Sequence, residues 1–186
     1  MSPWFTGYVG TKAGFVNNTT SKITPQAQVF GGGHLEFDNY MYLKADAGVG
    51  TGVQANAEFG KPFELNNNMS VRTSVGMDYF QSFVKRDYEE TLDDATVQNH
   101  SWKPNNIKGY GTIEVVHTTR RTEVGLGLQY GINHSALPKS LNSDKKSENR
   151  AYLAPVFNAR AEVANNVHLQ LKASTEYGSF GVLYTF

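Results

Sequence analysis

His134 and Ser135 have the residue types of a general base and its nucleophile, and they are adjacent in the chain. An imidazole activates a serine hydroxyl when both side chains lie within hydrogen-bonding distance on the same side of the backbone. Neighbouring residues of a β-strand point to opposite faces. The pair therefore predicts a nucleophilic site only where a turn begins at Ser135.

The remaining histidines give no metal motif, because none has a second histidine at ligand spacing. The five histidines are His34, His100, His117, His134 and His168. The chain has no cysteine, so a disulfide or a thiolate metal site is excluded. We expect no metal and no cofactor, and hydrogen-bonded structural roles for the inward histidines.

The composition limits the classes of protein to consider. The 186 residues suffice for a single domain, 1–186. Seventeen basic and seventeen acidic residues give no net charge, so we expect no nucleic-acid partner. Hydrophobic residues make up 39%, mean hydropathy is −0.45, and no stretch approaches the ~20 apolar residues of a membrane helix. A membrane β-barrel is still allowed, because only alternate residues of its strands face lipid.

Alternation of apolar and polar residues predicts an all-β chain of about ten strands. In the segment 121–134, for example, Val124, Leu126 and Leu128 alternate with glycines. Pro155 interrupts one strand, where we expect a lost ladder hydrogen bond and a bulge. An eight-strand arrangement would require the 40–65 pair or the last pair of strands to merge. The ten expected strands are 3–16, 23–37, 40–50, 52–65, 69–86, 106–117, 121–134, 151–164, 167–175 and 178–186.

The connections between these strands alternate between tight turns and longer loops. Asn and Asp, which adopt the left-handed backbone of tight hairpins, occupy most of the turns, as in Asn165-Asn166. The longest loops are 87–105 and 135–150. An even number of strands leaves both termini at the turn end. These features predict a closed antiparallel barrel.

Charges gather on the polar face of the strands, which carries six basic and eight acidic residues by this alternation. A lumen this narrow favours a plugging network of ion pairs, and the alternative is a narrow pore. We expect at least two ion pairs within one set of inward residues. That set is Arg72, Asp78, Glu123, Arg160, Glu162 and Lys172.

The C-terminal segment places Phe180, Val182, Tyr184 and Phe186 on one face and ends on phenylalanine. It resembles the C-terminal signature of bacterial outer-membrane β-barrel proteins. The resemblance implies a transmembrane barrel with short periplasmic turns, longer external loops, and a last strand that the barrel-assembly machinery recognises. Met1 directly before Ser2-Pro3-Trp4 is expected for a mature sequence whose signal has been removed.

The two longest loops carry opposite charges, and the 87–105 loop also carries Tyr88 and Trp102, which is typical of a recognition surface on a rigid scaffold. This favours a surface binding, adhesion or structural protein, as in small barrels of the opacity-adhesin type, with a host or surface ligand as possible partner. The candidate binding residues are Tyr88, Glu89, Glu90, Asp93, Asp94, Trp102, Lys139, Lys145 and Lys146.

An enzyme at the barrel rim is the alternative function. Outer-membrane lipid A deacylases use a His–Ser–acid arrangement, and omptin proteases use acids and histidines at the barrel mouth. The residues that correspond here are His134-Ser135 for the first, and Asp78, Asp93, Asp94, His100 and His134 for the second. Because no base and nucleophile have convincing spacing, the sequence favours binding over catalysis.

Overall fold

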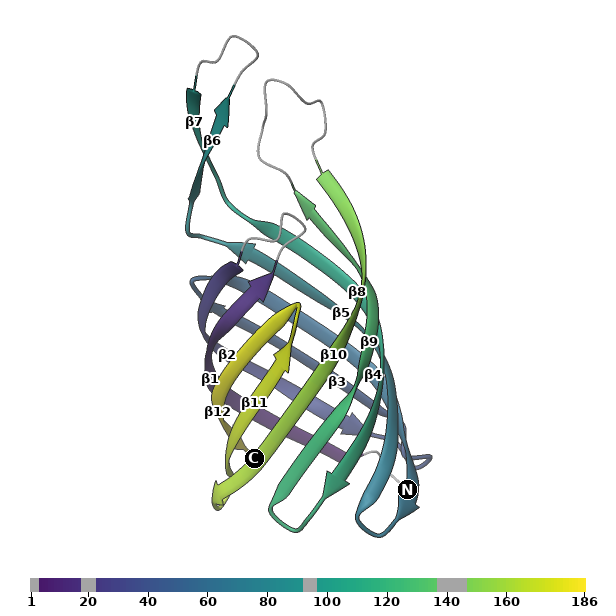
Figure 1. The fold of residues 1–186 in the computed structure, drawn as a ribbon. Coiled ribbons are helices and arrows are strands. Elements are labelled where there is room, and N and C mark those ends of the chain that lie inside the picture. The colour runs from purple at the N-terminus through teal and green to yellow at the C-terminus, as the bar shows by residue number, and fades with distance from the viewer. Residues whose placement is uncertain (1–3, 18–22, 92–96, 137–146) are drawn as a thin grey trace.

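The computed structural model describes residues 4–17, 23–91, 97–136 and 147–186, and only the backbone for residues 17, 86–91 and 98–100. Ten strands form a closed antiparallel barrel in the order β1-β12-β11-β10-β9-β8-β5-β4-β3-β2 (Figure 1). Their bounds are β1 (Trp4–Asn17), β2 (Ile23–Glu36), β3 (Tyr42–Gly50), β4 (Gly52–Asn66), β5 (Met69–Ser82), β8 (Asn105–Thr118), β9 (Thr122–Ala136), β10 (Ser147–Ala164), β11 (Val167–Ser174) and β12 (Tyr177–Thr185). Within these residues, no helix is long and apolar enough to cross a membrane.

The first and last strands close the barrel. β1 and β12 pair antiparallel from Tyr8↔Thr185 to Val16↔Tyr177. One residue further, Gly7 and Phe186 exchange backbone hydrogen bonds of 3.1 and 3.0 Å. Both termini therefore lie at the end of the barrel with the short turns (Figure 1). We call this the turn end and the opposite one the loop end. The prediction of ten strands is confirmed.

The tight turns use the left-handed backbone at two positions, Tyr40 and Asn166, each with φ of 63°. Asn166 is an expected residue for this conformation. In the first turn the left-handed residue is Tyr40, whereas Asn39 accepts a hydrogen bond of 3.2 Å from the Met41 amide. Asn39 thus stabilises the turn through its side chain, and the adjacent residue, Tyr40, adopts the left-handed φ.

The loop end carries more regular structure than the alternation predicted. Within the expected loop 87–105, β6 (Arg86–Thr91) and β7 (Val97–Trp102) form a separate two-stranded sheet. β9 and β10 continue to Ala136 and Ser147, so the second long connection is shorter than 135–150. Figure 1 shows the β6–β7 hairpin and the ends of β9 and β10 above the rest of the rim.

Pro155 does not mark a bulge, because the register between β9 and β10 is continuous through Pro155↔Leu128. The backbone amide of Glu162 donates to the Arg121 carbonyl next to β9, so the even-numbered residues of β10 direct their backbone groups toward β9. The odd-numbered residues, which include Pro155, therefore direct theirs toward β11. The β10–β11 ladder begins only at Val156↔Ser174. The nitrogen of Pro155 therefore faces an edge where no ladder bond is lost.

The exterior is apolar and the interior is charged. Leu126, Leu153 and Val75 point outward with 64%, 68% and 60% of their surface exposed, whereas the inward Lys108 and Glu114 are 3% and 6% exposed. A soluble barrel has the opposite arrangement, because exposing many large apolar side chains to water is unfavourable. An outward apolar face over a closed polar interior is the arrangement that a lipid bilayer stabilises.

Tyrosines of the interior lie against glycines on neighbouring strands. A Cβ atom on Gly60 would lie 2.6 Å from Cζ of Tyr42, and one on Gly76 would lie 2.5 Å from Cζ of Tyr110. Both distances are too short for a real side chain. The glycines therefore leave space for the tyrosine rings, which lie over the neighbouring strand on the inner side of the barrel wall and fill part of the lumen.

Candidate functional site

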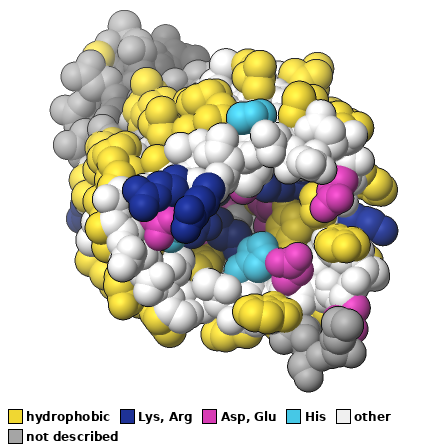
Figure 2. All heavy atoms as spheres, turned by 90° about the horizontal axis from the view of Figure 1, so that it is seen from below, with side chains coloured by type: hydrophobic (Ala, Val, Ile, Leu, Met, Phe, Trp, Pro, Cys, Tyr) yellow, Lys and Arg dark blue, Asp and Glu magenta, His cyan; other side chains and the backbone are white. Residues whose placement is uncertain are grey.

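The lumen contains a cavity of about 400 Å³. Figure 2 views the molecule from the turn end, where Lys, Arg, Asp, Glu and His side chains surround a hollow enclosed by an apolar exterior. All six basic residues expected on the polar face line the cavity, together with six of the eight acids. The basic residues are Lys12, Lys44, Arg72, Lys108, Arg160 and Lys172.

Arg72 joins three strands in the turn-end half of the lumen. Its guanidinium on β5 donates to Glu123 on β9 at 3.0 Å and lies 4.0 Å from Glu114 on β8. Glu114 also accepts a hydrogen bond from the Asn158 amide on β10. These contacts connect strands β5 to β10 across the interior. The cluster therefore satisfies two inward carboxylates with one cation and one amide.

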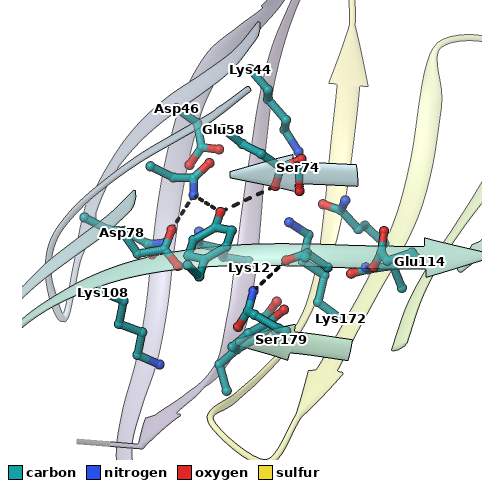
Figure 3. A pocket seen from close by; sticks show the side chains of 18 of the residues that line it. Lys12, Lys44, Asp46, Glu58, Ser74, Asp78, Lys108, Glu114, Lys172 and Ser179 are labelled. Atoms are coloured by element: carbon teal, nitrogen blue, oxygen red, sulfur yellow. Dashed lines mark hydrogen bonds between the residues drawn. The ribbon is translucent and has the colours of Figure 1, made fainter. Parts of the chain in front are cut away.

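Two further carboxylates of the cavity accept hydrogen bonds from neutral groups. The Tyr42 hydroxyl donates to Glu58 at 2.6 Å, and the Tyr110 hydroxyl donates to it at 3.4 Å. The Asn56 amide donates to Asp78. Figure 3 shows Glu58 and Asp78 turned toward one space inside the barrel. Among the described residues, Glu58 and Asp78 are thus held in place without a direct ion pair.

Of the expected set of lumen ion pairs, the described residues contain Arg72–Glu123. Asp78, Arg160 and Lys172 line the cavity but have no charged partner within 4.0 Å among these residues. Glu162 accepts instead from the Asn166 amide at the turn end, at 3.4 Å. A wider plugging network among these six residues stays a prediction.

A second ion pair, absent from the expected set, lies toward the loop end. Arg150 on β10 pairs with the carboxylate of Glu176, which precedes β12. Lys108 on β8 donates to the Glu176 carbonyl at 3.2 Å. Lys108 and Glu176 are 3% and 6% exposed. Because β8 and β12 are not neighbours, these three residues, which we call the outer clamp, connect separate parts of the wall across the lumen.

His134 and Ser135 point to opposite faces of β9. The His134 imidazole is exposed and lies 2.7 Å from the Asn149 side chain, whereas the buried Ser135 hydroxyl donates to Asn106 at 3.1 Å. β9 continues through both residues, so no turn brings them together. In the described part of the chain, no group of three His, Asp or Glu residues could hold a metal ion.

The candidate binding residues of the loops are only partly described. Tyr88, Glu89 and Glu90 belong to β6, whose backbone alone is described, and Trp102 ends β7 as a half-buried side chain. Their role stays a prediction. The others lie outside the described residues, namely Asp93, Asp94, Lys139, Lys145 and Lys146.

The rim acids and histidines of the protease alternative do not form a described site. Asp78 lies in the lumen, where it binds Asn56, and His134 faces outward. Only the backbone of His100 is described, and Asp93 and Asp94 lie outside the described residues. The described members of this set therefore point to different sides of the wall.

Comparison with known proteins gives a likeness of fold alone. No protein-family model matches the chain, and neither does any curated protein sequence. The chain is similar to the translocator domain of the autotransporter NalP from Neisseria meningitidis, with a TM-score of 0.50, 10% identity, and coverage of 100% of this chain and 87% of that one.

Two further solved structures are more distant. The β-domain of the Bordetella autotransporter BrkA has a TM-score of 0.48 at 9% identity, with 100% and 99% of the two chains covered. The outer-membrane protease OmpT from Escherichia coli has a TM-score of 0.48 at 8% identity, with 98% and 96% covered. The chain has the fold of a bacterial outer-membrane β-barrel. Its apolar exterior suits the lipid of that membrane, with the turn end in the periplasm and the loop end outside.

If the outer clamp blocks the passage of ions through the lumen, its removal should be measurable as conductance. We expect the wild-type protein to show no stable single-channel conductance in a planar bilayer. Glu176→Ala removes the carboxylate partner of Arg150 and leaves Arg150 near Lys108, so the two cations repel and the clamp opens. A resolved conductance step is then expected.

Glu148→Ala is the matched control, because Glu148 is an exposed acid two residues before Arg150. It removes the same charge without touching the clamp. A stable conductance of the wild type, or equal behaviour of the two variants, would contradict a clamp at Glu176.

Proposed function

We propose that this barrel binds a macromolecule of a host cell surface or matrix through its external hairpins. The observation that carries the proposal is the separate β6–β7 sheet, which extends above the barrel rim beside the ends of β9 and β10 (Figure 1). A regular hairpin holds its side chains in a fixed arrangement, so less conformational entropy is lost on binding than for an irregular loop. It is therefore suited to recognition.

The chemistry of the hairpins supports binding through mixed contacts. The sequence of β6 carries three acids, Asp87, Glu89 and Glu90, close to Tyr88. At the foot of the hairpin, Phe83 and Val84 are each 48% exposed. An aromatic and acidic hairpin favours a partner with basic groups and apolar contacts. The clamped lumen makes transport a weaker explanation of the same structure.

Exchange of residues 88–102 for a short Gly-Ser turn tests this function. The barrel ladder ends at Gln81↔Asn105, so the exchange leaves it intact. We expect a folded barrel that has lost attachment to matrix-coated wells and epithelial cells. Glu89→Gln with Glu90→Gln should reduce attachment, because the proposed partner carries basic groups.

Arg120→Gln with Arg121→Gln is the control, because it changes two exposed charges at the opposite end of the barrel. Attachment by the exchanged barrel at the wild-type level would refute the proposal. Removal of acyl chains from lipid A, or cleavage of a basic peptide, that His134→Ala abolishes would establish an enzyme instead.

We also propose that the barrel-assembly machinery recognises β12. Phe180, Val182 and Tyr184 form an outward aromatic and aliphatic row, and Phe186, at 69% exposed, ends it. The row matches the terminal signature described above. Deletion of Phe186 should then reduce the amount of barrel assembled in cells, while the purified variant should still refold in detergent.

A further inference from the structure

In the described part of the barrel, three lysines point into the lumen without a direct ionic partner. Lys12 on β1, Lys44 on β3 and Lys172 on β11 all line the cavity (Figure 3). Among the described residues, no carboxylate lies within 4.0 Å of any of their ammonium groups. Lys12 instead lies 4.9 Å from the centre of the Phe30 ring, and Lys44 lies 5.7 Å from that of Tyr8. Their charges are thus available to a ligand.

Charges of both signs surround the three lysines. Lys172 is close enough to repel both Lys12 and Lys44. Asp46 attracts Lys12 and Lys44, Glu58 attracts Lys44 and Lys172, and Asp78 attracts Lys12 and Lys172. Among the described residues, all of these carboxylates lie beyond ion-pair distance of the lysines, so the ammonium groups keep donors free for a ligand. Three cations held near one another by the surrounding wall favour an anion between them, because each ammonium group can donate a charge-assisted hydrogen bond.

Glutamine amides supply a second, independent feature of the same cavity. Gln26 is 8% exposed, and its Nε2 donor has no hydrogen-bond partner among the described residues. The Oε1 acceptor of Gln54 is likewise without a partner there. Both residues line the cavity. A buried polar atom without a hydrogen-bond partner is unfavourable, so one donor and one acceptor that lack partners among the described residues of a single cavity indicate bound polar groups.

We propose that the lumen binds one small organic anion, a sugar phosphate or sugar acid. Its anionic group lies among Lys12, Lys44 and Lys172, and its hydroxyl groups bind the amides of Gln26 and Gln54. The cavity of about 400 Å³ falls within the usual size of small-molecule sites. The ligand enters from the periplasm, because the turn end is hollow (Figure 2) and the outer clamp lies at the other end. This site is independent of the proposed surface binding.

Calorimetric titration of the detergent-folded full chain tests the proposal, with glucose 6-phosphate as the probe. We expect saturable binding of one molecule per barrel, weaker binding of inorganic phosphate, and no measurable binding of glucose. Lys172→Gln removes the central cation and should weaken glucose 6-phosphate binding about tenfold, with a similar loss for Lys12→Gln.

Lys61→Gln is the control, because Lys61 lies outside the cavity over the ring of Phe63 and the substitution changes the same charge. Circular dichroism checks that each variant is folded before its titration. The proposal is overturned if neither anion binds, if glucose binds as tightly as its phosphate, or if Lys172→Gln, Lys12→Gln and Lys61→Gln bind alike. Equal affinity for phosphate and glucose 6-phosphate overturns the part assigned to the glutamines.

Discussion

Leu128→Arg is expected to lower the free energy of unfolding of the barrel in lipid by about 2–4 kcal/mol, the cost of an arginine on the lipid face near the bilayer midplane. Leu128 lies midway along the outward row of β9 and is 50% exposed. In a soluble protein, a substitution at so exposed a position would change stability by only about 0.5 kcal/mol. Denaturant unfolding in vesicles measures the difference.

His134→Arg provides the control for Leu128→Arg on the same face of the same strand. His134 lies six residues nearer the loop end, where its exposed imidazole bonds Asn149. We expect a change well under half that of Leu128→Arg, because an arginine there reaches water. Equal and small effects at both positions would mean that the row from Val124 to Ile132 does not face lipid.

Most barrel strands could be placed from the sequence, because alternation in one strand reports burial on one face. The expected segment 167–175 corresponds to Val167–Ser174, and 23–37 corresponds to Ile23–Glu36. The segment 69–86 was predicted too long. β5 ends at Ser82 because its pairing with β8 stops at Gln81↔Asn105, although the apolar residues continue to Val84. Alternation within one strand cannot show where its partner ends.

The β6–β7 hairpin was missed for a related reason. Acidic and other polar residues outnumber apolar ones between Arg86 and Trp102, so the sequence of this segment predicted a loop. A two-stranded sheet outside the barrel buries neither face in a core, and the alternation that reveals a strand is then absent. Tyr88, Thr91, Val97 and Trp102 were the available signal, because such residues favour strands.

The lumen illustrates the difference between facing inward and having a partner. Alternation placed Arg72, Asp78 and Lys172 inside, and they line the cavity. The partner of Arg72 lies on β9, however, and β8 runs between the two strands. Contacts of this kind depend on the stagger between strands, which the sequence of one strand does not contain. Glu176 was missed because it lies in a short connection, outside any alternating segment.

Arg72→Met is expected to destabilise the barrel by about 1–3 kcal/mol, because it leaves two inward carboxylates without their cation. The lower part of this range allows for solvent at Arg72 and Glu123, whose side chains are 24% and 36% exposed, whereas Glu114 is 7% exposed. Arg72→Lys should restore only part of the loss, because an ammonium group cannot present the planar donor fork of a guanidinium. Denaturant unfolding in lipid vesicles measures both variants.

Arg121→Met separates this contribution from the general effect of removing an arginine. Arg121 is exposed beyond the turn end of β8 and loses the same charge and a similar volume. Its substitution should change stability by no more than about 0.5 kcal/mol, the usual range for exposed positions. Should Arg72→Met and Arg121→Met unfold at the same denaturant concentration, the Arg72 cluster would not stabilise the barrel. The additional Glu123→Gln change should recover part of the loss in Arg72→Met, because it removes a carboxylate that no longer has a partner.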